Sequence, residues 1–291
     1  MTHVHTVPFK VRLYELDSLG HVNNAVYLRY CEQAAMEASE NVGYTLERYR
    51  EKGWIWVIKH TILEHVAPAF YGDTIEVTTW VSQITPASTF REYLLTRQSD
   101  GALIARARSR WVLLDARSGR PIRMPQEMRE VFRPNGKIAV RDLKPMRGER
   151  PVEKAQTFHH FRKVQRYELD SAGHVNNAVY MNWLEQAKFE AMASVGYTSA
   201  RLREMGITIV QVRAEIEYIK PAMEGDELKI TSQLSAMART HGTWEHHIYR
   251  WPAGELVAKA WSTGAFLNST GRPTRAPEEL ISSLLEKNTQ T

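Results

Sequence analysis

The sequence predicts an α+β protein made of two tandem copies of one small domain, each an antiparallel sheet with a long helix across it. The first observation behind this prediction is an internal repeat: residues 14–45 match residues 167–198 at 22 of 32 positions, with an offset of 153. The offset continues without a gap to residues 114 and 267, although only 20 of those 69 further positions agree. A repeat of this period is domain-sized, too long for a solenoid or a propeller blade. The second observation is that both copies predict one strand, one long helix and four strands, in that order.

Length and composition agree with two globular domains. The 291 residues are enough for two cores of ordinary size, and 43% are apolar while 24% are charged. No apolar run could cross a bilayer and none resembles a secretory signal, so we expect a cytoplasmic protein with no membrane partner. The single cysteine, Cys31, also fits a reducing compartment.

The charge balance gives a mild preference for anionic partners. The net charge is +5, which suits coenzyme A or an acidic carrier protein. Because the basic residues form no long run, we do not expect nucleic-acid binding. The densest basic stretch also holds prolines and glycines, which indicates a linker. We therefore expect a first domain at 1–133, a linker at 134–155 and a second domain at 156–291.

The start of each copy predicts a strand followed by a long helix. Apolar and polar residues alternate at 9–15, which is typical of a strand. After a polar turn, Asn23 or Asn24 occupies the position of a helix N-cap. Apolar residues then recur at helical spacing over roughly five turns, and Gly43 marks the end as a left-handed C′ residue. The second copy repeats this pattern and ends its helix at Gly196.

The rest of each copy predicts an antiparallel sheet. Turn signals separate runs of β-forming residues. In the first copy a short polar helix at 46–52 is followed by strands expected at 54–66, 74–84, 89–98 and 102–115. In the second copy the strands are expected at 207–219, 227–237, 243–251 and 255–268. A short amphipathic helix is expected after each last strand.

The repeated strand-to-helix turn is where chemistry is expected. A helix N-terminus presents backbone N–H groups and about half a positive charge, so it can stabilise an oxyanion forming on a carbonyl. Asp17 and Asp170 each lie seven residues before the second asparagine of the turn. Gly20 and Gly173 permit positive φ and close approach of a carbonyl. A carboxylate there can act as a nucleophile or as a general base for water, with no metal and no cofactor.

Two motifs carry a resemblance to a known family. Residues 17–27 and 170–180 both read D-x-x-G-H-V-N-N-A-x-Y, and Pro68–Asp73 and Pro221–Asp226 both read P-A-x-x-G-D. These motifs resemble the hot-dog-fold thioesterases of the 4-hydroxybenzoyl-CoA thioesterase and acyl-ACP thioesterase group. Nearly the whole chain is covered, and two hot-dog domains in one polypeptide are similar to the tandem acyl-ACP thioesterases.

The resemblance implies both an activity and an arrangement. It implies hydrolysis of acyl-CoA or acyl-ACP thioesters, in fatty acid metabolism. It also implies two domains packed as an internal pseudo-dimer, with each site lying between them and two sites in one chain. Which carrier is used, and whether the protein forms a further homo-oligomer, is left open.

Site residues follow from the same resemblance. Asp17 and Asp170 match the catalytic aspartate, and His21 and His174 match a histidine of the plant-type enzymes. The substrate-binding turn comprises Gly20, Val22, Asn23, Asn24, Gly173, Val175, Asn176 and Asn177. Among these, the amide of Asn24 or Asn177 would polarise the thioester carbonyl. The plant-type enzymes have asparagine two positions before the histidine, where this chain has Leu19 and Ala172. We therefore favour aspartate with backbone amides, with histidine as a helper.

Each signal also has a structural interpretation. The aspartates could cap the turn, the histidines could fix it as donors, and the asparagines are good caps. Glu32 and Gln33, with Glu185 and Gln186, are interpreted as a buried hydrogen-bonding pair or as catalytic groups rather than as a solvated face. Cys31 is not expected to be a nucleophile, because its counterpart is a leucine.

Other side chains lead to two further interpretations. The scattered histidines fit no metal-ligand spacing, so no metal site is expected. Trp54 and Trp56 stand where the second copy has Ile207 and Ile209. These tryptophans either pack in the core, or they set the size of an acyl pocket and so give the two sites different preferences for acyl-chain length.

The hot-dog fold also serves two other functions. A hot-dog dehydratase or hydratase of 3-hydroxyacyl thioesters is disfavoured, because in that family a proline-rich segment follows the histidine. No proline lies between His21 and Gly43 or between His174 and Gly196. The second alternative is a non-catalytic module that binds acyl-CoA and leaves the thioester intact.

Overall fold

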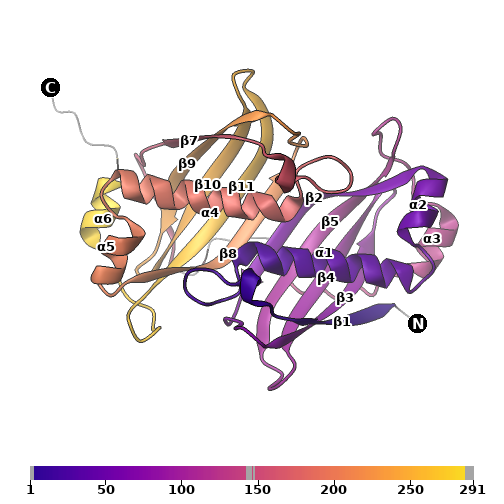
Figure 1. Ribbon diagram of the computed structural model, residues 1–291, viewed down its shortest axis with the longest axis horizontal. Coiled ribbons are helices and arrows are strands. Elements are labelled where there is room, and N and C mark those ends of the chain that lie inside the picture. Colours follow the sequence, from indigo (N-terminus) through magenta and orange to yellow (C-terminus); the bar gives the residue numbers. More distant parts are fainter. Residues whose placement is uncertain (1–2, 142–145, 147, 286–291) are drawn as a thin grey trace. The chain divides into compact units, whose positions relative to one another are not determined.

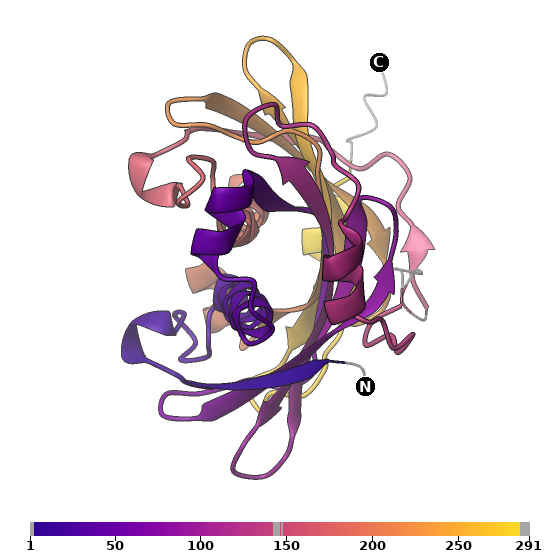
Figure 2. The ribbon, with the colours of Figure 1, turned by 90° about the vertical axis from the view of Figure 1, so that its right-hand side faces the viewer.

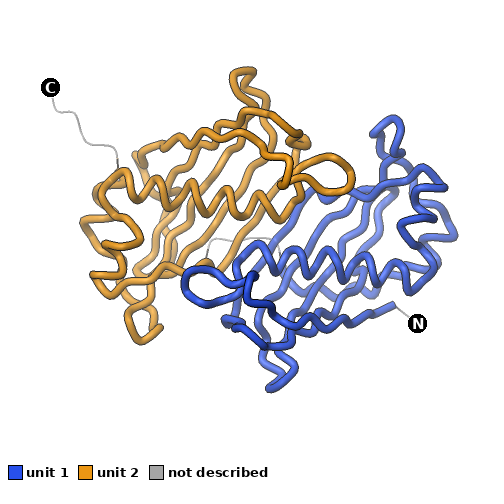
Figure 3. The backbone as a smooth tube through the Cα atoms, viewed as in Figure 1, with its two compact units in different colours: residues 1–142 blue, residues 143–291 orange. Residues whose placement is uncertain are grey.

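The computed structural model describes residues 3–141, 146 and 148–285. The chain divides into two compact units, residues 1–142 and 143–291 (Figure 3). The division falls inside the expected linker, whose bounds remain a prediction. Residues 142–145 and 147 of that linker, and 286–291 of the second domain, lie outside the described residues.

The first unit is a five-stranded antiparallel sheet with one long helix against it (Figure 1). Its strands follow the order β1-β3-β4-β5-β2. α1 lies on the concave side of its own sheet (Figures 1 and 2). The elements are β1 (Val4–Lys10), a 3-10 turn (Leu13–Glu15), α1 (Asn24–Glu40), α2 (Leu46–Lys52), β2 (Trp54–His65), β3 (Thr74–Ile84), β4 (Ser88–Arg97), β5 (Leu103–Asp115) and α3 (Gln126–Val131).

The second unit repeats this architecture. Its strands follow the order β8-β11-β10-β9, and both β6 and β7 pair with β9. The pairing of β7 with β9 matches that of β1 with β3. The elements are β6 (Arg150–Pro151), β7 (Phe158–Lys163), a 3-10 turn (Arg166–Glu168), α4 (Asn177–Ser194), α5 (Ser199–Glu204), β8 (Thr208–Tyr218), β9 (Glu227–Met237), β10 (His241–Arg250), β11 (Glu255–Leu267) and α6 (Glu278–Ser283). The expected α+β architecture is confirmed in both copies.

The long helix starts and stops at the residues that the sequence indicates. The Asn23 side chain accepts the Ala25 N–H at 3.0 Å, so Asn23 is the N-cap. At the other end Gly43 has φ of 83°. The Gly43 N–H donates to Glu40 O at 2.8 Å and the Tyr44 N–H donates to Ser39 O at 3.0 Å. This is the Schellman pair, in which a left-handed C′ glycine closes the helix.

The prediction of a strand at 9–15 is wrong. β1 ends at Lys10, and Leu13–Glu15 form a 3-10 turn. The Glu15 carboxylate accepts the Arg12 N–H at 2.7 Å and the Tyr30 hydroxyl at 2.7 Å, which curls the chain onto the helix. Alternation alone could not detect this turn, because Tyr30 lies fifteen residues further on.

Parts of the expected linker bond to the neighbouring sheets. The Asn135 N–H donates to Val81 O at 3.1 Å, and the Trp80 indole donates to Lys137 O at 2.8 Å. Further along, β6 pairs with β9 of the second unit.

Among the helices of the described residues, none has the length and apolarity needed to cross a membrane.

Candidate active site

The Asp17 turn is held by backbone hydrogen bonds that converge on one carboxylate. Asp17 Oδ1 accepts the Leu19 N–H at 2.8 Å and the His21 N–H at 3.1 Å. The Asp17 N–H donates to His21 O at 2.7 Å. Gly20 adopts a φ of 77°, in the left-handed region that favours glycine. The turn therefore orients the carboxylate through its own main chain.

The second copy builds the same turn around Asp170. Its Oδ1 accepts the Ala172 N–H at 2.8 Å, and its N–H donates to His174 O at 2.8 Å. His174 Nδ1 lies 3.9 Å from Asp170 Oδ1. The His174 and Asp170 side chains are 29% and 26% exposed, so both reach the surface. The structure thus brings the predicted aspartate and histidine together in this half.

The P-A-x-x-G-D loop lies directly beside each turn. The Val22 N–H donates to Ala69 O at 2.9 Å, and the Val175 N–H donates to Ala222 O at 2.9 Å. His21 forms an isolated β-bridge with Phe70, and their rings meet edge to face at 5.3 Å. The two motifs that carry the family resemblance therefore form one structural unit.

An arginine that was not singled out from the sequence braces this loop. Arg97 donates to Pro68 O at 2.8 Å and to Asp73 Oδ2 at 3.1 Å. Arg250 likewise donates to Pro221 O at 2.9 Å and to Asp226 Oδ2 at 3.0 Å. A signal did exist, because both copies keep arginine at this position although their strands differ at most others.

A buried tyrosine of each long helix bonds to the P-A-x-x-G-D loop. The Tyr180 hydroxyl accepts the Ala222 N–H at 3.2 Å. Burial raises the pKa of Tyr180 to about 12, and the negative charge of Asp170 contributes. Burial raises the pKa of Tyr27 to about 12 in the same way, with Asp17 contributing. Both hydroxyls therefore stay protonated near neutral pH.

The N-terminus of each long helix gives the site a partial positive charge. Asn23 and Asn176 cap the helices through their side chains. The Asn23 N–H donates to Glu15 O at 2.8 Å, so it is engaged in the turn. Asn24 and Asn177 are the first helical residues. Their amides lie at the positive end of the helix dipole.

Several other predicted residues have structural roles. Gln33 and Gln186 are exposed and donate to Glu37 and Glu190 one turn later, so our argument against a solvated face is wrong for these two. Cys31 is buried, and burial raises the pKa of its thiol, which disfavours the reactive thiolate. Trp56 does line a pocket of the first unit, as Ile209 does in the second.

The pockets within the two units lie away from the turns. In the first unit the empty space is about 370 Å³. It is lined partly by Ala35, Met36 and Ser39 of α1, in the C-terminal half of that helix. The pocket in the second unit is about 320 Å³ and is lined by Lys188 and Met192 of α4. The predicted turn residues line neither of these two pockets.

Comparison with known proteins places this geometry in a family. The model of the thioesterase-like superfamily matches twice, at residues 11–132 and 164–284. A chloroplastic acyl-acyl carrier protein thioesterase of Arabidopsis thaliana is 27% identical over 166 residues, covering 57% of this chain and 83% of that protein. The long-chain acyl-CoA thioesterase FadM of Escherichia coli is 36% identical over 101 residues, covering 35% of this chain and 76% of that protein.

Solved structures share the whole double fold. The 12:0-ACP thioesterase from Umbellularia californica gives a TM-score of 0.72 at 20% identity, covering 90% of this chain and 94% of that one. An acyl-ACP thioesterase from Bacteroides thetaiotaomicron gives 0.69 at 18% identity, covering 91% and 98%. At such identities the likeness concerns the fold. With one family match in each half, the chain belongs to the thioesterase-like superfamily and consists of two tandem hot-dog domains.

Proposed function

We propose that this chain hydrolyses acyl thioesters to a free acid and a thiol, with Asp17 and Asp170 as the reacting carboxylates. One observation carries the proposal: in both halves a carboxylate, oriented by the backbone of its own turn, lies seven residues before the start of a long helix. The names of the relatives, acyl-ACP and acyl-CoA thioesterases, support the reaction class.

For this reaction the turn must supply a carboxylate that acts as base or nucleophile, and amides that stabilise an oxyanion. The carboxylate removes a proton from water as the water oxygen attacks the carbonyl carbon, or attacks that carbon itself to give an anhydride that water then opens. In either route the carbonyl oxygen becomes an oxyanion. The amides of Asn24 and Asn177 stabilise this charge at the helix start. The carbon–sulfur bond then breaks, and the thiolate leaves and takes up a proton.

His21 and His174 act as helpers in this proposal. The 3.9 Å between His174 Nδ1 and Asp170 Oδ1 exceeds a direct hydrogen bond, but one water could bridge the two atoms. A histidine there can hold the attacking water or protonate the departing thiolate. The substrate-binding residues Gly20, Val22, Gly173 and Val175 act through their backbone conformation, which brings the carbonyl to the amides.

The carrier and the cellular setting form the finer part of the proposal. We expect acyl-CoA or acyl-ACP as substrate in fatty acid metabolism, and the net charge of +5 suits either anionic carrier. A cytoplasmic setting fits the single buried cysteine, Cys31.

Thiol release tests the proposal directly. Panels of acyl-CoA and acyl-ACP substrates of graded chain length are offered to the wild-type chain and to the Asp17→Asn/Asp170→Asn double variant. We expect release by the wild type and loss by the variant. Release that persists in the double variant contradicts the assigned residues. Binding of acyl-CoA without release across both panels favours the non-catalytic module.

A further inference from the structure

The pocket of the first unit contains a buried arginine. Arg91, on β4, is only 7% exposed. Its Nη1 donates to Thr79 Oγ1 at 3.4 Å, and its guanidinium lies 5.9 Å from the centre of the Phe132 ring. Over residues 3–141 and 148–285, no acidic side chain forms an ion pair with it. By contrast, Arg108 on the next strand lies 3.1 Å from Glu92.

An isolated guanidinium is costly in such a place. Burial lowers the pKa of Arg91, yet a guanidinium keeps its proton in proteins. A buried charge without a partner is strongly destabilising. Unlike a lysine, arginine cannot relieve this cost by becoming neutral. A ligand that carries a negative charge would relieve it.

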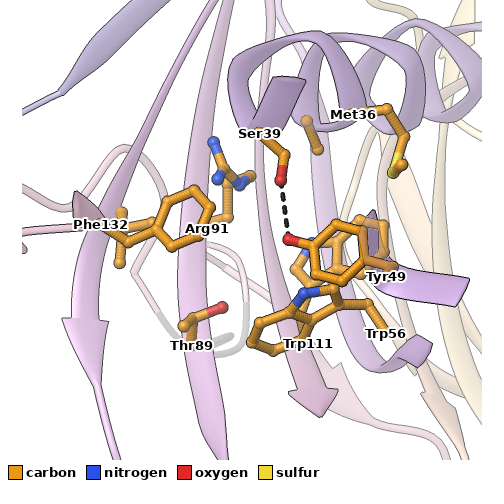
Figure 4. A pocket seen from close by; sticks show the side chains of 10 residues that line it. Met36, Ser39, Tyr49, Trp56, Thr89, Arg91, Trp111 and Phe132 are labelled. Atoms are coloured by element: carbon orange, nitrogen blue, oxygen red, sulfur yellow. Dashed lines mark hydrogen bonds between the residues drawn. The ribbon is translucent and has the colours of Figure 1, made fainter. Parts of the chain in front are cut away.

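The groups around Arg91 indicate which kind of ligand the pocket accepts. Figure 4 shows Arg91 beside Ser39, below α1, and the hydroxyls of Ser39 and Tyr49 lie 2.7 Å apart. Arg91 and Tyr49 both line the pocket. The Thr89 hydroxyl adds another polar group to the wall. Polar groups thus gather around the guanidinium.

The remaining walls are apolar and largely aromatic. They are formed by Met36, Trp56, Val81, Trp111 and Phe132. The empty space of about 370 Å³ includes the part that opens to solvent. Apolar walls with a few placed polar groups are typical of small-molecule sites.

We propose that this pocket binds an organic carboxylate with a small apolar body. The carboxylate pairs with both prongs of the Arg91 fork, a geometry that arginine favours. The body lies between Trp56, Trp111 and Phe132. The same chemistry has two sources: a free short-chain or aromatic acid, or the far-end carboxylate of a dicarboxylic acyl group still joined to its carrier. The second source rests on the proposed thioesterase function, whereas the first does not.

The second unit lacks this site, which supplies an internal comparison. Trp244 occupies the position of Arg91, and Gly264 occupies that of Trp111. A cation does line the pocket there, Lys188, but it comes from the helix at the position of Ala35. Lys188 is 3% exposed, and burial lowers its pKa. A lysine can therefore remain neutral without an anion, so Lys188 does not require the ligand that Arg91 requires.

Direct binding tests the proposal without any reaction. Phenylacetate and hexanoate are titrated by calorimetry and by the fluorescence of Trp56 and Trp111, beside the neutral phenylacetamide and hexanamide. We expect both acids to bind and the amides to bind at least about tenfold more weakly, since a charge-assisted pair is lost. Arg91→Met should weaken acid binding by a similar factor, and Lys188→Met is the matched control that should leave it unchanged.

Melting temperatures show whether each variant still folds. Removing a buried charge without a partner should leave the melting temperature of Arg91→Met unchanged or higher. If that variant fails to fold, Arg91→Lys replaces it, since lysine keeps the charge but loses the bidentate fork. Equal binding of acids and amides, or undiminished acid binding by the variants, would overturn the proposal.

Hydrolysis of two acyl-CoA substrates distinguishes a free acid from an acyl-group carboxylate as the source. Adipoyl-CoA and hexanoyl-CoA share a six-carbon chain, and only adipoyl-CoA ends in a carboxylate. If the acyl group is the source, Arg91→Met lowers kcat/KM for adipoyl-CoA alone. If a free acid is the source, both thioesters react as before while acid binding is lost. If the wild-type chain hydrolyses no thioester, the proposed function is contradicted. The titrations with free acids still test whether this pocket binds a carboxylate.

Discussion

The backbone N–H of His21 donates to the carboxylate of Asp17 at 3.1 Å, so the side chain proposed to react is also part of the turn that positions it. An asparagine can accept the same bond through its own Oδ1, because only the charge differs. Replacement by asparagine therefore separates chemistry from structure at this position. Replacement by alanine would remove both together.

Asp17→Asn and Asp170→Asn, made singly, should each remove the contribution of one half. Loss of a general base typically costs about 10²–10⁴-fold. If both halves react, each single variant keeps about half of the thiol release and the double variant keeps almost none. Steady-state thiol release measures this, and urea unfolding serves as the control. A double variant that folds normally and releases thiol at the wild-type rate would refute the assignment.

The arginine brace should be needed for activity more than for folding. Arg97→Gln loses the bonds to Pro68 O and Asp73 that hold the loop beside the turn. We expect the kcat of the first half, measured in the Asp170→Asn background, to fall about tenfold or more, because small displacements of a reacting group are costly. The stability loss should be only about 1–3 kcal/mol, as for a lost charge-assisted bond.

The exposed Arg117 provides the matched control for this prediction. Arg117→Gln should change neither kcat nor stability. Arg250→Gln tests the same brace in the second half. A brace that merely stabilises the fold would lower the melting temperature and leave kcat of the folded enzyme intact.

The cap of α1 should contribute measurably to stability. Asn23→Ala removes the acceptor of the Ala25 N–H, and such losses cost about 1 kcal/mol. Asn23→Ser keeps a capping oxygen and should retain most of that stability. Urea unfolding of both variants measures the difference. Equal loss in both would show that the side chain acts through something other than the cap.

The buried His246 should make the second unit sensitive to acid. Its ring lies between the Ser232 hydroxyl at 2.8 Å and the Ser262 hydroxyl at 3.0 Å. Burial lowers the pKa of His246 from 6.5 to about 3. The unfolded chain therefore takes up a proton below pH 6.5 that the folded chain refuses, so stability falls as the pH drops toward 3. Between pH 7 and pH 5 this amounts to about 2 kcal/mol.

His246→Gln tests this assignment. The variant should lose about 2 kcal/mol less than the wild type between the two pH values. His247→Gln is the control, since that neighbouring side chain is 26% exposed. Urea midpoints at pH 7 and pH 5 give the comparison. The same pH dependence in wild type and His246→Gln would contradict a role for this ring.

Local signals were strong enough to predict most of the secondary structure. Thr74–Ile84 and Glu227–Met237 form strands with the expected bounds. Leu46–Lys52 forms the expected short helix, which Gly53 ends with a φ of 65°. Turn residues and caps act within a few positions of the element that they bound. The sequence therefore predicts such elements without reference to the rest of the fold.

Long-range partners could not be predicted in this way. Glu15 meets Tyr30, and this contact replaces the end of the expected first strand by a 3-10 turn. Arg97 meets Asp73 across a pair of strands, and the sequence marks this arginine only by keeping it in both copies, without indicating its partner. In the second unit Trp183 takes the role of Tyr30, since its indole donates to Glu168 at 2.9 Å.

The amino-acid sequence by itself determined the repeat, the helix boundaries and the motif around Asp17 and Asp170. These depend on residue identity, spacing and contacts within a turn or two. Only the tertiary structure decided which loop braces each turn and that Arg91 is buried, with no acidic partner in the part of the chain that the structure describes. Both outcomes depend on which distant strands become neighbours, and packing of the whole domain fixes that choice.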